Sequence, residues 1–285
     1  MIVTHECAAH AAACLRSLGA QRADVALCAW VVDNASADGT PDVAAAHPWA
    51  AVERNDVNRG FAAACNQGLR RGAAPFVLFL NPDTVLPPGA LRACLAELRR
   101  NPDVAALGPR LVDAHGRFDP RCRRGFPTVW GAACFLTGLD RVLPDRRSRS
   151  YTMGWLSSMR ATDVAALSGA FMLCRRGAVE RAGGFDERFF MYAEDIDLCV
   201  RLSGAGGRVR YWPGVDVVHV GGGSGRNAAS RAAFFRTMAP LIRRHRPGRA
   251  TPLVAAAVGV AAEAMLTMER IAAARTRKGP PRLPA

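Results

Sequence analysis

Residues 61–84 read FAAACNQGLRRGAAPFVLFLNPDT, and this stretch decides the fold. Its first part, 61–71, is Ala-rich and typical of a helix, whereas 76–81 is a short apolar run typical of a buried strand. The strand ends in the acidic turn Asn81-Pro82-Asp83-Thr84. A helix followed by a buried strand with polar residues at its end is typical of one unit of a parallel sheet.

The same alternation of strands and helices extends on both sides of this stretch. The predicted strands of this part are 2–4, 26–33, 51–54 and 76–81, and the predicted helices are 8–18, 41–46, 61–71 and 88–100. This order predicts an α/β fold with a parallel sheet and helices on both faces. Ligands bind at the carboxyl ends of the strands in such sheets, so the residues after each strand form the candidate site.

The second half of the sequence has a different character. Residues 117–149 are rich in Arg, Pro and Gly with weak periodicity, and 151–163 continue this pattern. We expect a long surface excursion there, of the kind that is usually functional or mobile. Beyond it the sequence predicts a strand at 167–174, a helix at 193–202, and short strands at 209–212 and 217–220.

Acidic turns follow two of the predicted strands. Asp33-Asn34-Ala35-Ser36 comes after the second, and Asn81-Pro82-Asp83-Thr84 after the fourth. Each turn alone is also explained by ordinary turn or capping chemistry. Two acid-bearing turns at one sheet edge favour a binding site.

The helix predicted at 193–202 begins with three acids that helical geometry separates. Asp195 shares a face with the apolar residues three, four and seven positions later, so it lies at the N-terminal end of the buried stripe. Asp197 is expected to form an exposed ion pair with Arg201, and Glu194 lies between these two environments. A partly buried carboxylate in the first turn is a candidate general base; the alternative is a capping role.

Composition and charge limit the class of protein. The chain has 285 residues, half of them hydrophobic, which excludes a disordered polyelectrolyte. Its nine Cys form no C-x-x-C pair, so we expect reduced core cysteines rather than disulfides or a zinc site. The start shows no signal peptide, so we expect a cytoplasmic protein.

The net charge of +14 is concentrated in two segments. Residues 243–285 carry +7 and residues 117–149 carry +5. Such basic patches attract phosphates, nucleic acid or an anionic membrane surface, unless they reflect composition bias. Aromatic residues do not alternate with the Arg clusters and no nucleic-acid-binding fingerprint is present, so we expect no specific nucleic-acid partner.

Four ordered motifs together resemble glycosyltransferase family 2, and within it the bacterial rhamnosyltransferase-like branch. They are Val31–Thr40, Asn58–Gly68, Phe79–Thr84, and Gly183–Arg201 followed by His219. The resemblance spans about residues 2–225. It implies a GT-A fold, a Rossmann-like and mostly parallel mixed sheet flanked by helices, that binds a nucleotide-sugar with a divalent metal and inverts the anomeric carbon.

The resemblance implies a metal site. Asp83 matches the last acid of the family's D-x-D motif, and Asn81 occupies its first position. His219 matches a histidine that completes the metal site in some members, although a lone histidine at a strand end is more often structural. Oxygen ligands with one imidazole suit Mg²⁺ or Mn²⁺.

The resemblance also implies contacts with the donor nucleotide. Asp33 matches the acid that holds the base or ribose, and Thr4 lies beside it at the end of the first strand. Asn58, Gly60 and Asn66 match the segment that runs past the nucleotide. For Gly60 the alternative is a tight entry into the following helix.

Asp195 matches the family's catalytic base, which deprotonates the acceptor hydroxyl. Glu194 is then expected to support the acceptor or the base. The sequence departs from the family at the first strand, which ends in Thr4-His5-Glu6 instead of the usual Thr-Tyr-Asn.

The same resemblance implies a donor and an acceptor. We expect L-rhamnose from dTDP-rhamnose to be transferred to a lipid-linked, polyprenyl-borne or cell-surface glycan of a bacterium. The alternatives are another UDP- or GDP-sugar on the same site, or a non-catalytic basic protein that binds nucleotides or nucleic acid.

The C-terminal tail is expected to form a basic helical extension. Residues 253–262 are apolar, but Glu263 and Glu269 follow well before the roughly 20 residues of a membrane span. Apolar residues at spacings of four and three predict an amphipathic helix on the inner face of the plasma membrane. The alternative is packing on the catalytic domain or on a second subunit of a homodimer. We therefore expect a catalytic domain at 1–225 and an extension at 226–285.

Overall fold

The computed structural model forms two compact units, residues 1–221 and 222–285. It describes residues 1–128, 130, 131, 134, 135, 138–221 and 228–245, with the single positions 256, 259, 260, 263 and 267. In the second unit α9 spans Ala228–His245. Most of the tail helix predicted around residues 253–268 and the basic end after it lie outside the described residues.

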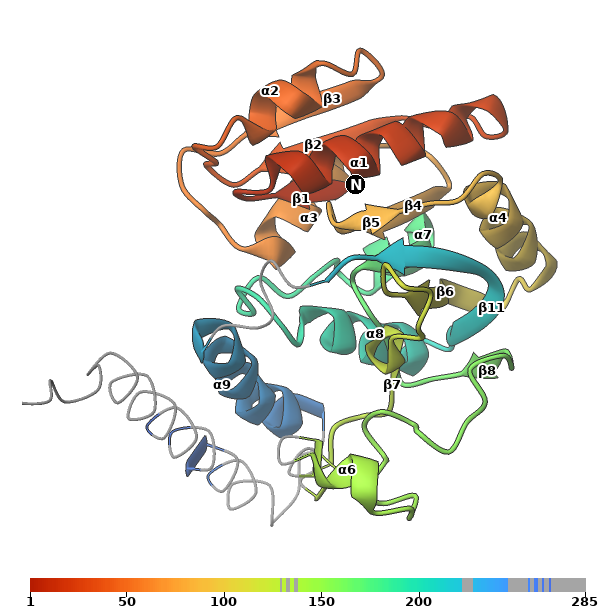
Figure 1. Cartoon of the computed structure of the whole chain (residues 1–285), viewed down its shortest axis with the longest axis vertical. Helices are drawn as coiled ribbons and strands as arrows, with labels where there is room; N and C mark the ends of the chain where they lie inside the picture. Colours follow the sequence, from red (N-terminus) through yellow and green to blue (C-terminus); the bar gives the residue numbers. More distant parts are fainter. Residues whose placement is uncertain are drawn as a thin grey trace, which may run out of the picture. The chain divides into compact units, whose positions relative to one another are not determined.

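The N-terminal half alternates strands and helices as the sequence predicts (Figure 1). Its strands are β1 (Ile2–Thr4), β2 (Ala29–Asp33), β3 (Ala50–Arg54), β4 (Phe76–Leu80) and β5 (Thr84–Val85). Its helices are α1 (Ala8–Ala20), η1 (Gln21–Ala23), α2 (Thr40–Ala45), α3 (Phe61–Arg71) and α4 (Ala90–Arg100). The second strand begins three residues later than predicted.

The second half of this unit contains one long strand at each end and short elements between them. The strands are β6 (Val104–Val112), β7 (Arg123–Arg124), β8 (Thr162–Asp163), β9 (Ala166–Leu167), β10 (Phe171–Arg175) and β11 (Arg208–His219). The helices are η2 (Pro120–Cys122), α6 (Leu139–Val142), α7 (Arg176–Arg181) and α8 (Glu194–Gly204).

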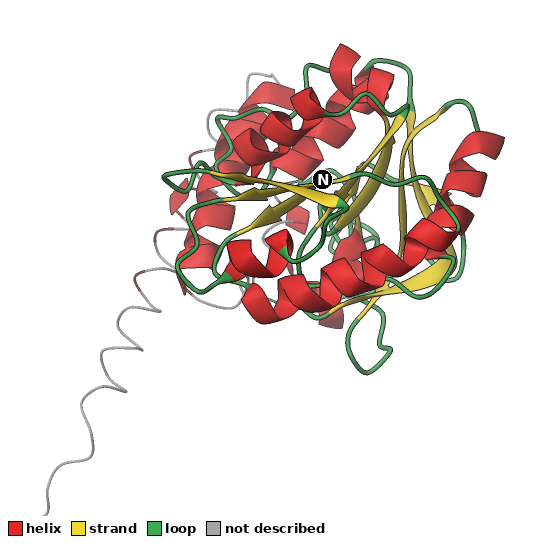
Figure 2. Cartoon of the chain, turned by 90° about the horizontal axis from the view of Figure 1, so that it is seen from above, coloured by secondary structure: helices red, strands yellow, loops and turns green. Residues whose placement is uncertain are grey.

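The main sheet is mixed and has the order β3-β2-β1-β4-β10-β6-β11-β5, with β8 added beside β11. β1, β2, β3, β4, β6 and β11 run in one direction, and β10 runs against its neighbours β4 and β6. Helices lie on either side of the strands (Figure 2). The predicted α/β fold with a mostly parallel mixed sheet is confirmed, and the carboxyl ends of the parallel strands meet at one edge.

Strand β6 lies inside the sheet and was not predicted from the sequence. Its first residues, Val104–Leu107, are buried, but Gly108-Pro109-Arg110 interrupts the apolar run. Proline cannot donate to a neighbouring strand, and the register of β11 is irregular between Trp212 and Asp216, opposite Pro109 and Arg110. Two strands were predicted at 209–212 and 217–220, but the structure has the single strand β11. The irregular residues between Trp212 and Asp216 interrupt the strand pattern in the sequence.

The strand predicted at 167–174 is divided by a short turn. β9 pairs with β7 in a separate two-stranded sheet, whereas β10 joins the main sheet. Between them Ser168 N donates to Cys122 O, and Ala170 O accepts from Asn81 N at 3.0 Å. The chain therefore changes sheets at residues 168–170, at the edge where the candidate site lies.

Candidate active site

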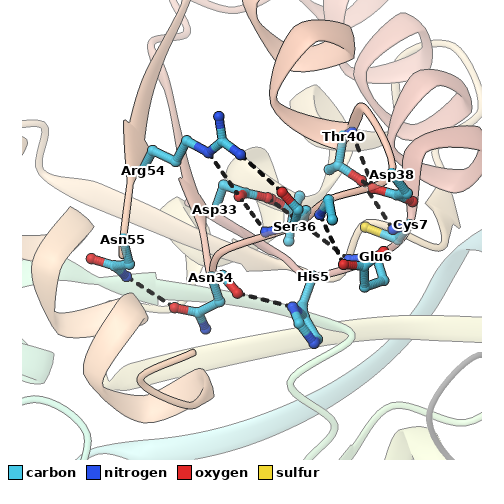
Figure 3. A network of polar contacts seen from close by, with 12 residues as sticks. His5, Glu6, Cys7, Asp33, Asn34, Ser36, Asp38, Thr40, Arg54 and Asn55 are labelled. Carbon is cyan, nitrogen blue, oxygen red and sulfur yellow. Dashed lines mark hydrogen bonds and ion pairs between the residues drawn. The ribbon is translucent and has the colours of Figure 1, made fainter. Parts of the chain in front are cut away.

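Asp33 and Thr4 lie side by side at the ends of β2 and β1, because the strand register pairs these two residues. Thr4 Oγ1 donates to Asp33 Oδ1 at 2.9 Å. Ser36 donates to the same carboxylate from its backbone N at 2.9 Å and from its hydroxyl at 2.6 Å (Figure 3). Asp33 has no exposed surface. A nucleotide reaches this carboxylate only if the residues that cover it move.

His5 and Glu6, at which the sequence departs from the family, connect two loops by hydrogen bonds (Figure 3). His5 Nδ1 lies 2.9 Å from Asn34 O, and Glu6 Oε1 accepts a hydrogen bond from Ala37 N at 2.8 Å. Glu6 N in turn donates to Ser36 Oγ at 2.9 Å. His5 and Glu6 therefore hold the loop after β1 against the turn after β2.

Gly60 allows two distant segments to approach closely. Its φ is +84°, and a Cβ there would lie 2.4 Å from Phe190 O. Phe61 N donates to that carbonyl at 2.8 Å, and Asn58 Oδ1 accepts from Gly60 N at 2.9 Å. The start of α3 thus supports the segment that leads into α8.

Gly60→Ala is expected to destabilise the protein by about 2–4 kcal/mol, because it combines a strained positive φ with a backbone clash. Gly39→Ala is the matched control: its φ is +79°, but nothing lies within 4 Å of the added Cβ. We expect about 1 kcal/mol for this control. Chemical denaturation measures both values, and equal losses would contradict the steric explanation.

Asn66 uses its side-chain amide within the protein. Its Nδ2 donates to Phe185 O and to Glu187 Oε1, and its Oδ1 accepts from Phe185 N, each at 2.9 Å. The residue is 8% exposed. This geometry favours positioning of the turn before α8 over the predicted contact with the donor.

His219, at the end of β11, lies between two carboxylates. Its Nε2 is 3.4 Å from Asp83 Oδ1, and its Nδ1 is 3.5 Å from Asp119 Oδ2. Pairing of β11 with β5 sets His219 opposite Thr84 and so brings it to the Asp83 turn. Burial lowers the pKa of His219, but the two carboxylates outweigh it and raise the pKa to about 9.

Asp119 is a site residue that the sequence did not indicate. Arg121 donates to both of its oxygens, from Nε and Nη2, at 2.9 Å each. Although burial opposes the charge, His219 and Arg121 hold the pKa of Asp119 well below its usual range. The sequence signal is only an Asp two residues before an Arg, a common pattern on protein surfaces.

Asp83 and His219 can hold one divalent ion together. Asp83 Oδ1 is buried and has no hydrogen-bond partner in the described part of the chain. Two ligand atoms 3.4 Å apart fit adjacent positions on an ion with bonds of about 2.0–2.6 Å. Among the described residues no group of three or more His, Cys, Asp or Glu is arranged to hold a metal ion.

Asp195 lies at the N-terminus of α8 and is 7% exposed. Arg124 Nη2 forms an ion pair with Oδ2, and Gly169 N donates to the same oxygen at 3.1 Å. Ile196 N donates to Oδ1 at 2.8 Å. The carboxylate is thus oriented by three different segments.

Glu194 is buried beside Asp195, and its Oε2 has no hydrogen-bond partner among the described residues. Burial, and then the neighbouring charge of Asp195, raises the pKa of Glu194 well above its usual range. Two adjacent carboxyl groups therefore have different environments.

A short segment connects the Asp83 turn with Asp195. Ala170 O accepts from Asn81 N, and Gly169 N donates to Asp195. Asn81 O also accepts from the Thr84 hydroxyl at 2.7 Å, which shapes the turn around Asp83. The residues predicted for metal binding and for catalysis therefore lie at one edge of the sheet.

The comparison with known families decides what this site belongs to. The family model of glycosyl transferase family 2 matches residues 1–182, more than half of the chain. The chain belongs to glycosyl transferase family 2. The matched residues include Asp33 and Asp83, whereas α8 and His219 lie beyond them.

Curated relatives in glycosyl transferase family 2 include two rhamnosyltransferases. The chain is 34% identical over 223 residues to N-acetylglucosaminyl-diphospho-decaprenol L-rhamnosyltransferase of Mycobacterium tuberculosis, covering 71% of this chain and 70% of that protein. It is 30% identical over 158 residues to rhamnosyltransferase WbbL of Escherichia coli, covering 55% and 56%.

A solved structure with a similar fold is mannosyltransferase PcManGT from Pyrobaculum calidifontis, in complex with GDP-Man and Mn²⁺. The TM-score is 0.60 at 22% identity, covering 98% of this chain and 74% of that one. This likeness, with the observed sheet order, identifies the fold as GT-A. Family membership makes the chain an inverting glycosyltransferase.

Two charge assignments of the sequence need correction. Asp197 and Arg201 do form an ion pair, but Asp197 is fully buried rather than exposed. Arg201 also donates to Ala182 O. Arg123 and Arg124, counted within a basic surface patch, are buried.

Among the described residues, no helix has both the length and the apolar character needed to cross a bilayer.

Proposed function

We propose that this family 2 glycosyltransferase transfers L-rhamnose from dTDP-rhamnose to a hydroxyl of a lipid-linked bacterial glycan. The names of two relatives, one a rhamnosyltransferase acting on a decaprenyl-diphosphate sugar, support the sugar and the acceptor class. The observation that carries the proposal is the meeting of Asp83, His219 and Asp195 at one sheet edge.

In this proposal Asp83 and His219 bind Mg²⁺ or Mn²⁺, and the Asn81 turn holds Asp83 in place. The ion, when bound, neutralises the charge that gathers on the diphosphate leaving group. Asp119 lies against Nδ1 of His219, so it favours the tautomer with the proton on Nδ1. The lone pair of Nε2 is then on the side of Asp83, where the ion would bind. Mn²⁺ in the PcManGT complex supports a divalent ion.

The nucleotide lies, in this proposal, along Thr4, Asp33, Asn58 and Gly60 at the ends of β1 and β2 and the start of α3. Asp195 accepts the proton of the acceptor hydroxyl as its oxygen attacks the anomeric carbon, and the bond from that carbon to the diphosphate breaks on the opposite face. Glu194 supports Asp195 or the acceptor. A single displacement of this kind inverts the anomeric configuration.

A thermal-shift screen of nucleotide-sugars with Mn²⁺ or Mg²⁺ tests the donor, followed by transfer to an N-acetylglucosaminyl-diphosphate lipid acceptor. We expect dTDP-rhamnose to give the largest metal-dependent rise in Tm and an inverted product. A larger Tm shift and faster transfer with a UDP- or GDP-sugar would identify that sugar, instead of dTDP-rhamnose, as the donor. Metal-independent binding of every donor would contradict the proposed site.

We further propose that the enzyme works in the cytoplasm, bound peripherally to the inner face of the plasma membrane where its acceptor is anchored. The charge of +7 in residues 243–285, the first of which form the basic last turn of α9, supports this location. We expect sedimentation with phosphatidylglycerol vesicles at low salt. Equal sedimentation with neutral vesicles would contradict an electrostatic contact.

A further inference from the structure

Arg124 and Asp195 form an ion pair in which both side chains are largely buried. The two residues are 71 positions apart, and their side chains are only 11% and 10% exposed. Arg124 belongs to β7, whereas Asp195 lies in the first turn of α8. An arginine from the Arg-rich excursion is thus in direct contact with the proposed catalytic base.

The guanidinium of Arg124 is anchored independently of Asp195. Nη2 donates to Leu167 O at 2.9 Å, and Nη1 lies 3.5 Å from the hydroxyl of the buried Tyr151. The next residue, Gly125, donates from its backbone N to Tyr151 O at 2.9 Å. Main-chain and side-chain contacts therefore hold the arginine in place in addition to its contact with the carboxylate.

The charges around Asp195 come from a small number of groups. Arg124 is the cation in contact with it, and the uncharged neighbours are the buried phenol of Tyr151 and the buried thiol of Cys199. Glu194 adds a second carboxyl group whose Oε2 has no partner among the described residues. The cation therefore holds the Asp195 carboxylate in place by direct contact.

Arg123, the preceding residue, is buried without such a role. Its guanidinium donates to Ser157 O at 2.8 Å and to Leu156 O at 2.5 Å. It also stacks on the Tyr211 ring at 4.7 Å. A buried arginine in this strand therefore needs no carboxylate partner, and stability alone does not explain why Arg124 faces Asp195.

We infer that Arg124 is a positioning residue for catalysis: it fixes the orientation of the Asp195 carboxylate that receives the acceptor proton. This inference rests on the proposed function of Asp195. Oδ2 is held by Arg124 and Gly169 N, and Oδ1 by Ile196 N alone, so Oδ1 is the oxygen with the fewest protein partners and the one that takes the proton.

The experiment compares Arg124→Gln, Arg124→Lys and the matched control Arg123→Gln in the full chain, by transfer kinetics across pH and by donor affinity. We expect Arg124→Gln to lower kcat about 10- to 100-fold, with the donor Kd within threefold. Without the guanidinium the protonated carboxyl is favoured, so the acidic limb of the pH profile moves to higher pH. Arg123→Gln should leave that limb in place even if Tm falls.

Arg124→Lys keeps the charge but loses the planar contact, so we expect a reduced kcat with the limb near its wild-type position. This variant decides the outcome if Arg124→Gln does not fold. A wild-type kcat in Arg124→Lys, or an equal shift of the limb in Arg123→Gln, would overturn the inference. A wild-type enzyme that transfers no sugar from any donor would overturn the proposed function and the inference with it.

Discussion

Asp195→Asn is expected to lower the rate of sugar transfer about 1000-fold while leaving the affinity for the nucleotide-sugar within about threefold. A positioned general base contributes roughly 10²- to 10⁴-fold to such a step, and the amide cannot accept the proton. The amide oxygen can still accept from Arg124 and Gly169. The amide nitrogen that replaces Oδ1 cannot accept from Ile196 N, so one of the three contacts of the side chain is lost. Transfer kinetics and calorimetric titration of the donor measure the two quantities.

Asp197→Asn is the matched control on the same helix. Asp197 is also buried and also paired with an arginine, Arg201, but that arginine is bonded to Ala182 O rather than to the segments around the proposed base. We expect a lower Tm and a kcat per folded enzyme close to that of the wild type. Loss of donor binding in Asp195→Asn, or equal loss of kcat in both variants, would refute the role of Asp195 as base.

Asp83→Asn is expected to weaken metal-dependent binding of the donor about 100-fold. The substitution keeps the shape of the side chain but removes the charge that a divalent ion requires from its hard oxygen ligand. It also leaves His219 with Asp119 as its only carboxylate neighbour among the described residues. Titration of the donor at fixed Mn²⁺ or Mg²⁺ measures the effect.

Donor binding measured after the metal ion has been removed with EDTA is the control for this second prediction. With EDTA present, wild type and Asp83→Asn should bind the donor equally weakly, because Asp83 then has no ion to share with the diphosphate. A difference that persists without metal would mean that Asp83 contacts the nucleotide itself. His219→Gln should resemble Asp83→Asn in the presence of metal and match wild type in its absence.

The sequence predicted those parts of the fold that depend on local periodicity. β1 to β4 and the helices between them follow from alternation of apolar runs and Ala-rich segments, and they were found within a few residues. β6 was missed because Gly108-Pro109-Arg110 breaks its pattern, and the strand is held by neighbours on both sides rather than by its own sequence.

The candidate site was predictable only where a motif carries it. Asp83, Asp195 and His219 stand in recognisable motifs, and the structure brings them to one edge. Asp119 and Arg124 stand in an Arg-rich segment without periodicity, and only tertiary packing distinguishes a buried arginine from a solvated one. The family resemblance assigned Asn66 to the nucleotide, whereas its hydrogen bonds to residues 185 and 187, more than a hundred positions away, could not be predicted from the sequence.

The turn at residues 168–170 is hydrogen-bonded to both halves of the proposed site. Ala170 O accepts from Asn81 N, beside the proposed metal ligand Asp83, and Gly169 N donates to Asp195, the proposed base. A backbone displacement of this turn would shift both partners in concert, so departure of the nucleotide and removal of the proton keep a common geometry. Insertions at this point should be tolerated far less well than insertions in the long excursion that precedes it.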